Sequence, residues 1–243
     1  MIHKTRGIVF HSFKYSETSL ITRIYTDRFG LQGYLVRGAR KPRAKLRASL
    51  FQPLNILEME VYHKEKSTLQ NIKEAHQAYI FESIPFDVHK GSISMFMGDI
   101  LSKAIREEEA NAGLFDFLYN MILKLDRQKE EIASFHLHFL VQLSRYLGFF
   151  PQGKYDRQTP FFDMVEGSFC SYQPLHSHYL NQPLSESFST LIQVPAEEVV
   201  TLRLDRGKRN QLLESIISYY RLQYDGLQDI QSHQVLRKIF DQP

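Results

Sequence analysis

The chain has 243 residues, a mass of 28.6 kDa and 43% apolar residues, including 18 phenylalanines and 13 tyrosines. This composition excludes a disordered chain and allows one large domain or two modest ones. The longest uncharged apolar runs are far shorter than the roughly 20 residues of a membrane-spanning helix, and the first residues do not resemble a secretory signal. We therefore expect a soluble cytoplasmic protein with no membrane partner. The single cysteine, Cys170, excludes an internal disulfide and a cysteine-cluster metal site.

Charge is distributed unevenly along the chain. The net charge is +3, but residues 1–47 hold eleven basic residues against two acidic ones, so the remaining 196 residues carry a net charge of −6. An N-terminal segment with this excess of positive charge is typical of a surface that binds a polyanion, and nucleic acid is the most common polyanion for such proteins.

Residues 1–80 have the pattern of β-strands. Apolar and β-branched residues form runs separated by turn residues. The expected strands cover residues 5–13, 19–26, 31–37, 50–63 and 68–79. Gly30 can take a positive φ in the turn after Asp27, which predicts a hairpin between the second and third strands. Five strands bury one face most simply as a small barrel.

The apolar period changes to that of helices after residue 80. Apolar faces at helical spacing span residues 93–105, 114–125, 132–147 and 212–220. Residues 151–183 are rich in proline, glycine, serine and histidine and predict loop or a short hairpin. We expect residues 1–80 to form a β-domain and residues 81–243 to form a helical domain with an irregular insert at 151–183, which makes the fold class α+β.

The sequence contains no familiar catalytic motif. A phosphate-binding loop, a nucleophile elbow, a dinucleotide fingerprint and a zinc-protease helix are all absent. His136 and His138 are two residues apart on an expected helix and point about 200° apart, so they cannot share a metal, and we expect one near the core and the other toward solvent. We predict neither an enzyme nor a cofactor.

The strongest candidate site is the loop expected after the third strand. It has no acidic residue, and Gly38 and Pro42 give it a defined shape. Arginine suits phosphate because its planar donors can bind two oxygens. We predict that this loop binds DNA through Arg37, Arg40, Lys41, Arg43, Lys45 and Arg47, with the ring of Tyr34 nearby.

Several other residues are secondary candidates. Phe13 and Phe51 flank the loop and could stack on bases, although a position in the core is favoured for both. Arg6 and Lys14 are basic residues on the expected barrel. A second basic cluster, Arg203, Arg206, Lys208 and Arg209, precedes the last expected helix.

The motifs of the first 42 residues resemble a known family. The segments at 5–9, 15–21 and 26–30 (TRGIV, YSETSLI and TDRFG) are followed by Arg37-Gly38-Ala39-Arg40-Lys41-Pro42. Their order and spacing are similar to the N-terminal domain of RecO, a family of bacterial DNA repair and recombination mediators. The resemblance extends over most of the chain and implies an OB-fold barrel followed by a helical domain.

The resemblance also implies a function and partners. RecO proteins bind single- and double-stranded DNA, anneal strands coated by single-strand binding protein, and act with RecR to help RecA load. Many members carry a four-cysteine zinc motif where this chain keeps only Cys170, so we predict no zinc. We expect a non-enzymatic, nucleoid-associated mediator. The alternative is a protein scaffold whose basic face binds an acidic partner.

Overall fold

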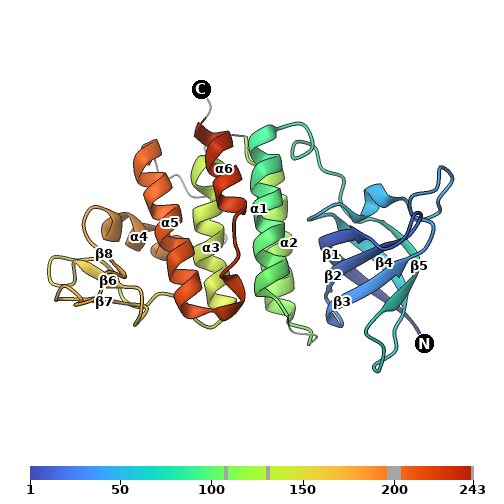
Figure 1. Cartoon of the computed structure of the whole chain (residues 1–243), viewed down its shortest axis with the longest axis horizontal. Coiled ribbons are helices and arrows are strands. Elements are labelled where there is room, and N and C mark those ends of the chain that lie inside the picture. The colour runs from blue at the N-terminus through green and yellow to red at the C-terminus, as the bar shows by residue number, and fades with distance from the viewer. Residues whose placement is uncertain (107–108, 130–131, 196–203, 242–243) are drawn as a thin grey trace. The chain divides into compact units, whose positions relative to one another are not determined.

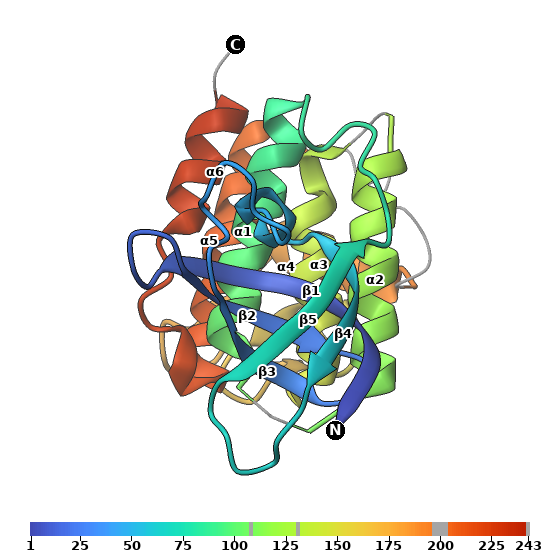
Figure 2. The ribbon, with the colours of Figure 1, turned by 90° about the vertical axis from the view of Figure 1, so that its right-hand side faces the viewer.

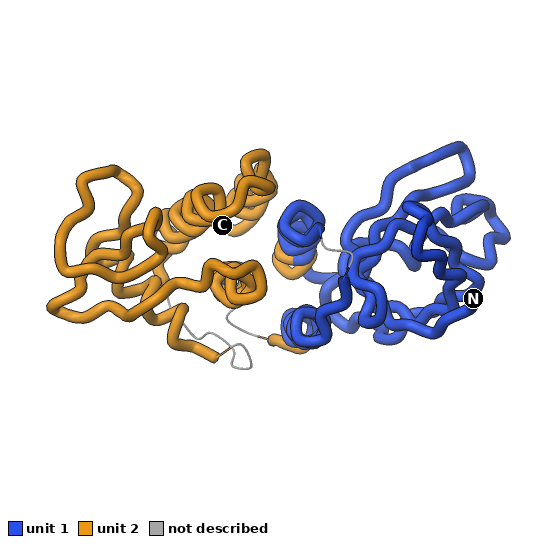
Figure 3. The backbone as a smooth tube through the Cα atoms, turned by 90° about the horizontal axis from the view of Figure 1, so that it is seen from below, with its two compact units in different colours: residues 1–87, 94–126 blue, residues 88–93, 127–243 orange. Residues whose placement is uncertain are grey.

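The structure is a computed structural model of the whole chain, and it describes residues 1–106, 109–129, 132–195 and 204–241 (Figure 1). Contacts within the chain divide it into two compact units, which Figure 3 shows in different colours. Unit 1 comprises residues 1–87 and 94–126, and unit 2 comprises residues 88–93 and 127–243.

Unit 1 contains the expected barrel. Five strands close in the order β1-β2-β3-β5-β4, and Figure 2 shows them facing the viewer. Their bounds are β1 Ile2–Lys14, β2 Leu20–Thr26, β3 Gly30–Val36, β4 Ile56–Tyr62 and β5 Gln70–Gln77. β2 and β3 form the predicted hairpin, with Thr26 opposite Gly30, and Gly30 has a φ of 60°. The α+β class and the five-stranded barrel are therefore confirmed.

The fourth strand begins later than the sequence predicts. Residues 50–55 do not extend β4, because the chain first makes a 3-10 turn, η1 (Ala48–Phe51). The side chain of Asn55 holds this turn by donating to the carbonyls of Ser49 and Leu50, each at 3.0 Å. The periodicity of apolar residues cannot distinguish such a turn from a strand end, since both bury the same residues.

The barrel interior is filled by side chains that alternate along each strand. Buried members of this core include Val9 of β1, Ile24 of β2, Val36 of β3 and Met59 of β4. Phe51 of η1 closes the core and is 1% exposed.

Two helices pack with the barrel in unit 1. They are the larger part of α1 (Val88–Ala104), from residue 94, and α2 (Ala112–Arg127). The ring of Tyr25 on β2 stacks between Phe10 on β1 and Phe115 on α2, with centroid separations of 5.6 and 6.4 Å. The barrel thus ends near the expected boundary at residue 80, and the compact unit extends beyond it to residue 126. The division into domains at 1–80 and 81–243 stays a prediction.

Unit 2 consists of helices and one small sheet. Its elements are α3 Phe135–Tyr146, α4 Leu184–Gln193, α5 Arg206–Gln223 and α6 Ser232–Asp241, with the short 3-10 turns η2 Ile132–Ser134 and η3 Asp225–Leu227. Within the described residues, no helix is long and apolar enough to cross a bilayer.

The insert at residues 151–183 is more regular than expected. It contains a three-stranded sheet in the order β7-β6-β8, formed by β6 Phe161–Asp163, β7 Ser168–Cys170 and β8 Tyr179–Leu180. Phe162 anchors the sheet, with its ring 4.7 Å from that of Phe188 on α4 and 5.4 Å from that of Tyr219 on α5. Strands of two or three residues are too short to show a period in sequence.

Both histidines of α3 are buried, so the expectation that one faces solvent is wrong. His136 and His138 are each 2% exposed, because every residue from 135 to 144 of this helix is buried. Burial, assisted by the charge of Arg209, lowers the pKa of His136 to about 3. This imidazole is therefore neutral at neutral pH.

Candidate nucleic-acid interface

The predicted binding loop, residues 37–47, joins β3 to η1 and has a defined backbone. The N–H of Lys41 donates to the carbonyl of Gly38 at 3.0 Å, and the N–H of Ala44 donates to that of Lys41 at 3.1 Å. These bonds form two successive turns. We call residues 37–47 the basic loop.

The base of the basic loop is fixed to the barrel. Ala39 is 3% exposed and belongs to the barrel core. Its carbonyl accepts from the N–H of Ala48 at 3.0 Å, and the N–H of Arg40 donates to the carbonyl of Thr18 at 3.1 Å. The loop therefore presents its charges from a fixed frame, which reduces the entropy lost when a ligand binds.

Half of the loop cations have partners within the protein. Arg37 donates to the side-chain oxygen of Asn71, and Arg40 donates to the carbonyl of Glu17, each at 3.2 Å. Lys45 lies 3.5 Å from the carboxylate of Glu74, with both side chains more than half exposed. An exposed pair of this kind is weak and is easily exchanged for another anion.

The other three cations are available to a ligand. Lys41, Arg43 and Arg47 are exposed, and their side chains make no hydrogen bond or ion pair within the described residues. The basic loop therefore keeps a large excess of positive charge on one exposed segment, and phosphate groups are the natural ligands for it.

Tyr34 does not line this surface. It is 0% exposed and lies in the barrel core, at an inward position of β3 next to Val36 in the strand alternation. Burial raises the pKa of its hydroxyl well above the usual value. The proposed DNA contact of Tyr34 is therefore wrong, because a ring sealed inside the barrel cannot meet a base.

Replacing Tyr34 by phenylalanine is expected to leave the melting temperature unchanged or to raise it slightly. The hydroxyl is buried and finds no hydrogen-bond partner among the residues that the structure describes. Removing an unsatisfied buried polar group is neutral or stabilises the fold by up to about 1 kcal/mol. DNA affinity should not change. Tyr220→Phe is the matched control, since that hydroxyl donates to the carbonyl of Leu140 and its loss should cost about 1 kcal/mol. Thermal melts of both variants decide this, and a Tyr34→Phe variant that binds DNA more weakly would contradict the burial argument.

Phe13 and Phe51 differ in their environments. Phe51 is buried in the core, as favoured, whereas Phe13 is 45% exposed near the end of β1. The core assignment of Phe13 is therefore wrong. The pairing of β1 with β2 shifts between Val9 and His11, and such a bulge changes which residues of a strand face inward.

The two secondary candidates on the barrel also differ. Arg6 is held by the protein, with its Nε 3.0 Å from the carboxylate of Asp27 and its guanidinium 4.9 Å from the ring centre of Phe115. Its charge is thus largely neutralised by contacts within unit 1. Lys14 is exposed, and its side chain makes no hydrogen bond or ion pair among the described residues, so it can contact a ligand.

The C-terminal basic cluster lies at the start of α5 in unit 2, and its member Arg203 falls outside the described residues. Asp205 caps this helix by accepting from the N–H of Lys208 at 2.9 Å, and the amine of Lys208 lies 3.8 Å from the same carboxylate. Arg209 lies over the ring of Phe240 at 5.7 Å. Arg206 and Lys208 are exposed, so this cluster remains a secondary candidate for contacts with DNA.

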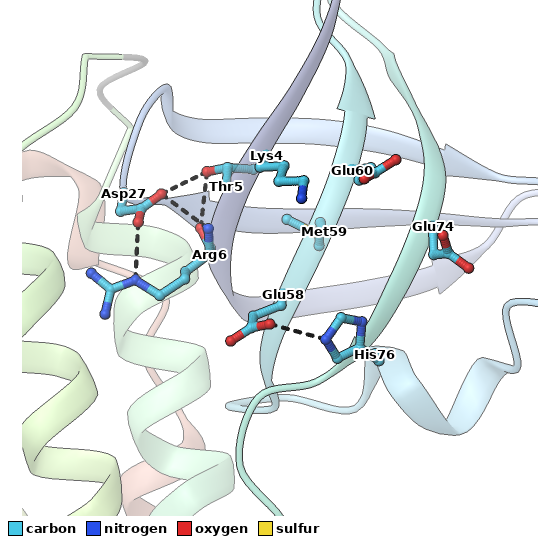
Figure 4. Close-up of a pocket in the computed structure, with 9 residues that line it drawn as sticks. All are labelled: Lys4, Thr5, Arg6, Asp27, Glu58, Met59, Glu60, Glu74 and His76. Carbon is cyan, nitrogen blue, oxygen red and sulfur yellow. Dashed lines mark hydrogen bonds and ion pairs between the residues drawn. The ribbon is translucent and has the colours of Figure 1, made fainter.

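One outer face of the barrel is unsuited to a polyanion. A hollow of about 380 Å³ over β1, β4 and β5 contains four carboxylates, from Asp27, Glu58, Glu60 and Glu74. Figure 4 shows Glu58 directed toward His76, at 3.0 Å. Where β1 pairs with β4, Lys4 is opposite Glu60 and Arg6 is opposite Glu58. The ion pairs are Arg6 with Asp27 and Glu60 with Lys73. The residues that line this hollow carry more carboxylates than lysine and arginine side chains, which disfavours phosphate.

A second hollow, of about 390 Å³, has the opposite character. It lies over β2, β3 and the β4–β5 connection and contains Arg23 and Arg106, and none of the described residues that line it carries a carboxylate. We call it the β2–β3 hollow. Arg106 follows α1 and is distant in sequence from the barrel, so no local pattern could have placed it here. The outward position of Arg23 could have been read from the alternation along β2.

Metal-ligating groups do not gather anywhere in the part of the chain that the structure describes. Cys170 donates its thiol to the carbonyl of Tyr172, and burial raises the pKa of this thiol. His176 pairs with Asp163 at 3.3 Å. The absence of zinc stays a prediction, and elemental analysis of the purified protein would test it.

Comparison with known proteins connects this geometry to a family. Residues 1–81 match the family model for the N-terminal part of recombination protein O, and residues 85–229 match the model for its C-terminal part. The chain belongs to the RecO family. A "DNA repair protein RecO" of Phocaeicola vulgatus is 36% identical over 240 residues, which cover 99% of this chain and 100% of that protein. RecO proteins of Bacteroides fragilis and Flavobacterium psychrophilum are each 38% identical, over 99% and 98% of this chain and 100% and 98% of their own lengths.

Proposed function

We propose that this RecO-family chain is a DNA-binding recombination mediator in DNA repair, and that the basic loop is its main DNA contact. The observation that carries this proposal is the exposed, anchored loop with six cations, three of which have no partner among the described residues. Family membership and the name of the relatives, "DNA repair protein RecO", support it.

The chemistry of the loop favours backbone contacts over base readout. Arginine and lysine on a loop reach phosphate oxygens, which are the same in every sequence. Neutralising two phosphate backbones also lowers the repulsion between strands that must pair. We propose that the protein promotes annealing in this way, without catalysis and without a nucleotide cofactor.

The proposed partners follow from the family. They are single- and double-stranded DNA, RecR, single-strand binding protein and, indirectly, RecA, which would be loaded onto DNA coated by single-strand binding protein. A nucleoid-associated cytoplasmic location fits these partners.

A salt titration tests the proposal. Affinity for two unrelated oligonucleotides, as single strands and as duplexes, is measured by fluorescence anisotropy across a salt series with and without RecR. If three or four loop cations contact phosphates, log K should fall with log salt with a slope of about −2 to −3 for single strands. If the protein does not bind DNA but binds an acidic protein tightly, the alternative is favoured. In that case the protein is a scaffold that uses its basic face for protein contacts.

A further inference from the structure

The β2–β3 hollow is shaped by the lack of a side chain on β3. Arg23 of β2 pairs with Gly33 of β3. A Cβ at Gly33 would lie 3.1 Å from the carbonyl of Thr68 and 3.2 Å from a methyl of Leu69, which is closer than most real contacts. Glycine therefore lets the β4–β5 connection approach the strand and leaves space beside Arg23.

An exposed aromatic ring borders this space. Phe13 of β1 lies opposite Ile21 of β2 and is 45% exposed, and both residues line the hollow. Leu69 adds a further apolar wall. A half-exposed phenylalanine beside an apolar floor presents a flat surface on which another planar ring can stack, and every nucleobase has such a face.

The charges of the hollow select an anion. Arg23 and Arg106 are exposed and line it without an acidic neighbour among the lining residues. The hollow over β1, β4 and β5 has nearly the same volume but four carboxylates. The β2–β3 hollow therefore combines apolar side chains, the exposed ring of Phe13 and two arginines at its edge. These features match one unpaired nucleotide, because its base is planar and its phosphates are negative.

The start of the basic loop is close along the chain to residues that line the hollow. Along β3, Gly33 and Arg37 are four residues apart, about 13 Å at the rise of a strand. Near the same end of the loop, Arg40 contacts Glu17 and Thr18 in the β1–β2 turn, which follows Phe13 by four to five residues. A single strand that follows the loop can therefore reach the hollow.

We propose that the β2–β3 hollow receives an unpaired base of single-stranded DNA, stacked on Phe13, with the flanking phosphates on Arg23 and Arg106. This proposal rests on the proposed DNA binding and adds a strand preference to it. The basic loop binds phosphates of either form, whereas the hollow binds only a base released from its stack. It therefore favours single strands over duplexes.

The full-length Phe13→Ala variant tests the proposal. Anisotropy titrations at one salt concentration use an oligothymidine and a duplex of mixed sequence. Single-strand affinity should fall about 5- to 150-fold, the loss expected for one stacked base, while duplex affinity should stay within twofold. Tyr62→Ala is the matched control, because Tyr62 is 42% exposed on β4 and does not line the hollow. Phe13→Trp should restore single-strand binding.

Further measurements separate the possible outcomes. Arg23→Gln should make the single-strand salt slope shallower by about 0.7, and it keeps the test valid if Phe13→Ala melts early. Unchanged single-strand affinity in folded Phe13→Ala, while the wild type binds DNA in a salt-dependent way, overturns the hollow assignment alone. A wild type that binds no DNA overturns the proposed function itself. If Phe13→Ala instead keeps its affinity for single-stranded DNA but no longer binds an acidic peptide with an apolar end, the hollow is a peptide site and the proposal is wrong.

Discussion

Replacing Asp126 by alanine is expected to destabilise unit 1 by about 3 to 5 kcal/mol. The carboxylate is 2% exposed near the end of α2. It accepts from the N–H groups of Glu82, Ser83 and Ile84, each at 2.9 Å, and from the hydroxyl of Tyr79 at 3.0 Å. Removing it takes the acceptor from three backbone N–H groups and one hydroxyl in buried or partly buried bonds. A buried donor that loses its partner costs about 1 to 3 kcal/mol.

The pH dependence of this contribution has a definite sign. Burial alone would raise the pKa of Asp126, but the hydrogen bonds to its carboxylate outweigh burial and hold the pKa below the usual value. A depressed pKa stabilises the fold fully above the unfolded pKa of about 3.9, and the stabilisation is lost as the pH falls through the folded pKa. The difference between wild type and Asp126→Ala should therefore be constant near neutrality and shrink below about pH 4.

Thermal and urea unfolding at pH 7 and at pH 3 measure the effect. Asp116→Ala is the control, since Asp116 lies on the same helix with its side chain 66% exposed, 3.9 Å from Arg6, and should cost less than about 1 kcal/mol. Equal melting temperatures for the two variants at pH 7 would show that Asp126 does not hold residues 79–84 in place.

Changing Arg40, Lys41, Arg43 and Lys45 together to alanine is expected to remove most of the DNA affinity. If three or four of these groups contact phosphates of a single strand, the slope of log K against log salt becomes shallower by about 2 to 3 units. If the variant and the wild type bind equally at 1 M salt, this difference in slope makes the variant bind about 100- to 1,000-fold more weakly at 0.1 M salt. All sequences should be affected about equally. Melting should hardly change, because exposed charges contribute little to stability.

A charge-matched variant controls for net charge. Changing Lys129, Lys154, Arg157 and Lys238 together to alanine removes four exposed cations elsewhere in the chain. This variant should change the slope of log K against log salt by less than about half a unit. An unchanged slope in the loop variant, with the fold intact, would move the DNA site to Arg206, Lys208 and Arg209 or to the region of Lys14.

The sequence predicted the fold where the signal was local. Alternation and turn residues placed the five strands, and helical spacing placed α1, α2, α3 and α5. The basic loop was visible because six charges stand within eleven residues. The family motifs point to the same loop, since the segment from Arg37 to Pro42 carries both the loop charges and a motif typical of the family.

Features that depend on distant contacts could not be predicted in this way. The β1 bulge reversed the expected environment of Phe13. Arg106 reaches the β2–β3 hollow only through the packing of unit 1. Tyr34 is a different case. Its alternation with Val36 along β3 already indicated an inward position, but the prediction gave more weight to its closeness in sequence to the basic loop.

The stacking of Tyr25 on Phe115 sets an order of events during protein synthesis. The last barrel strand ends at Gln77, but the helix that covers Tyr25 is complete only at Arg127. At about 5 to 20 residues per second, the ribosome needs roughly 2 to 10 s to make the intervening segment. A barrel that forms before α2 is made would leave the ring of Tyr25 without its cover, and chains that terminate between residues 80 and 126 should be substrates for chaperones and proteases.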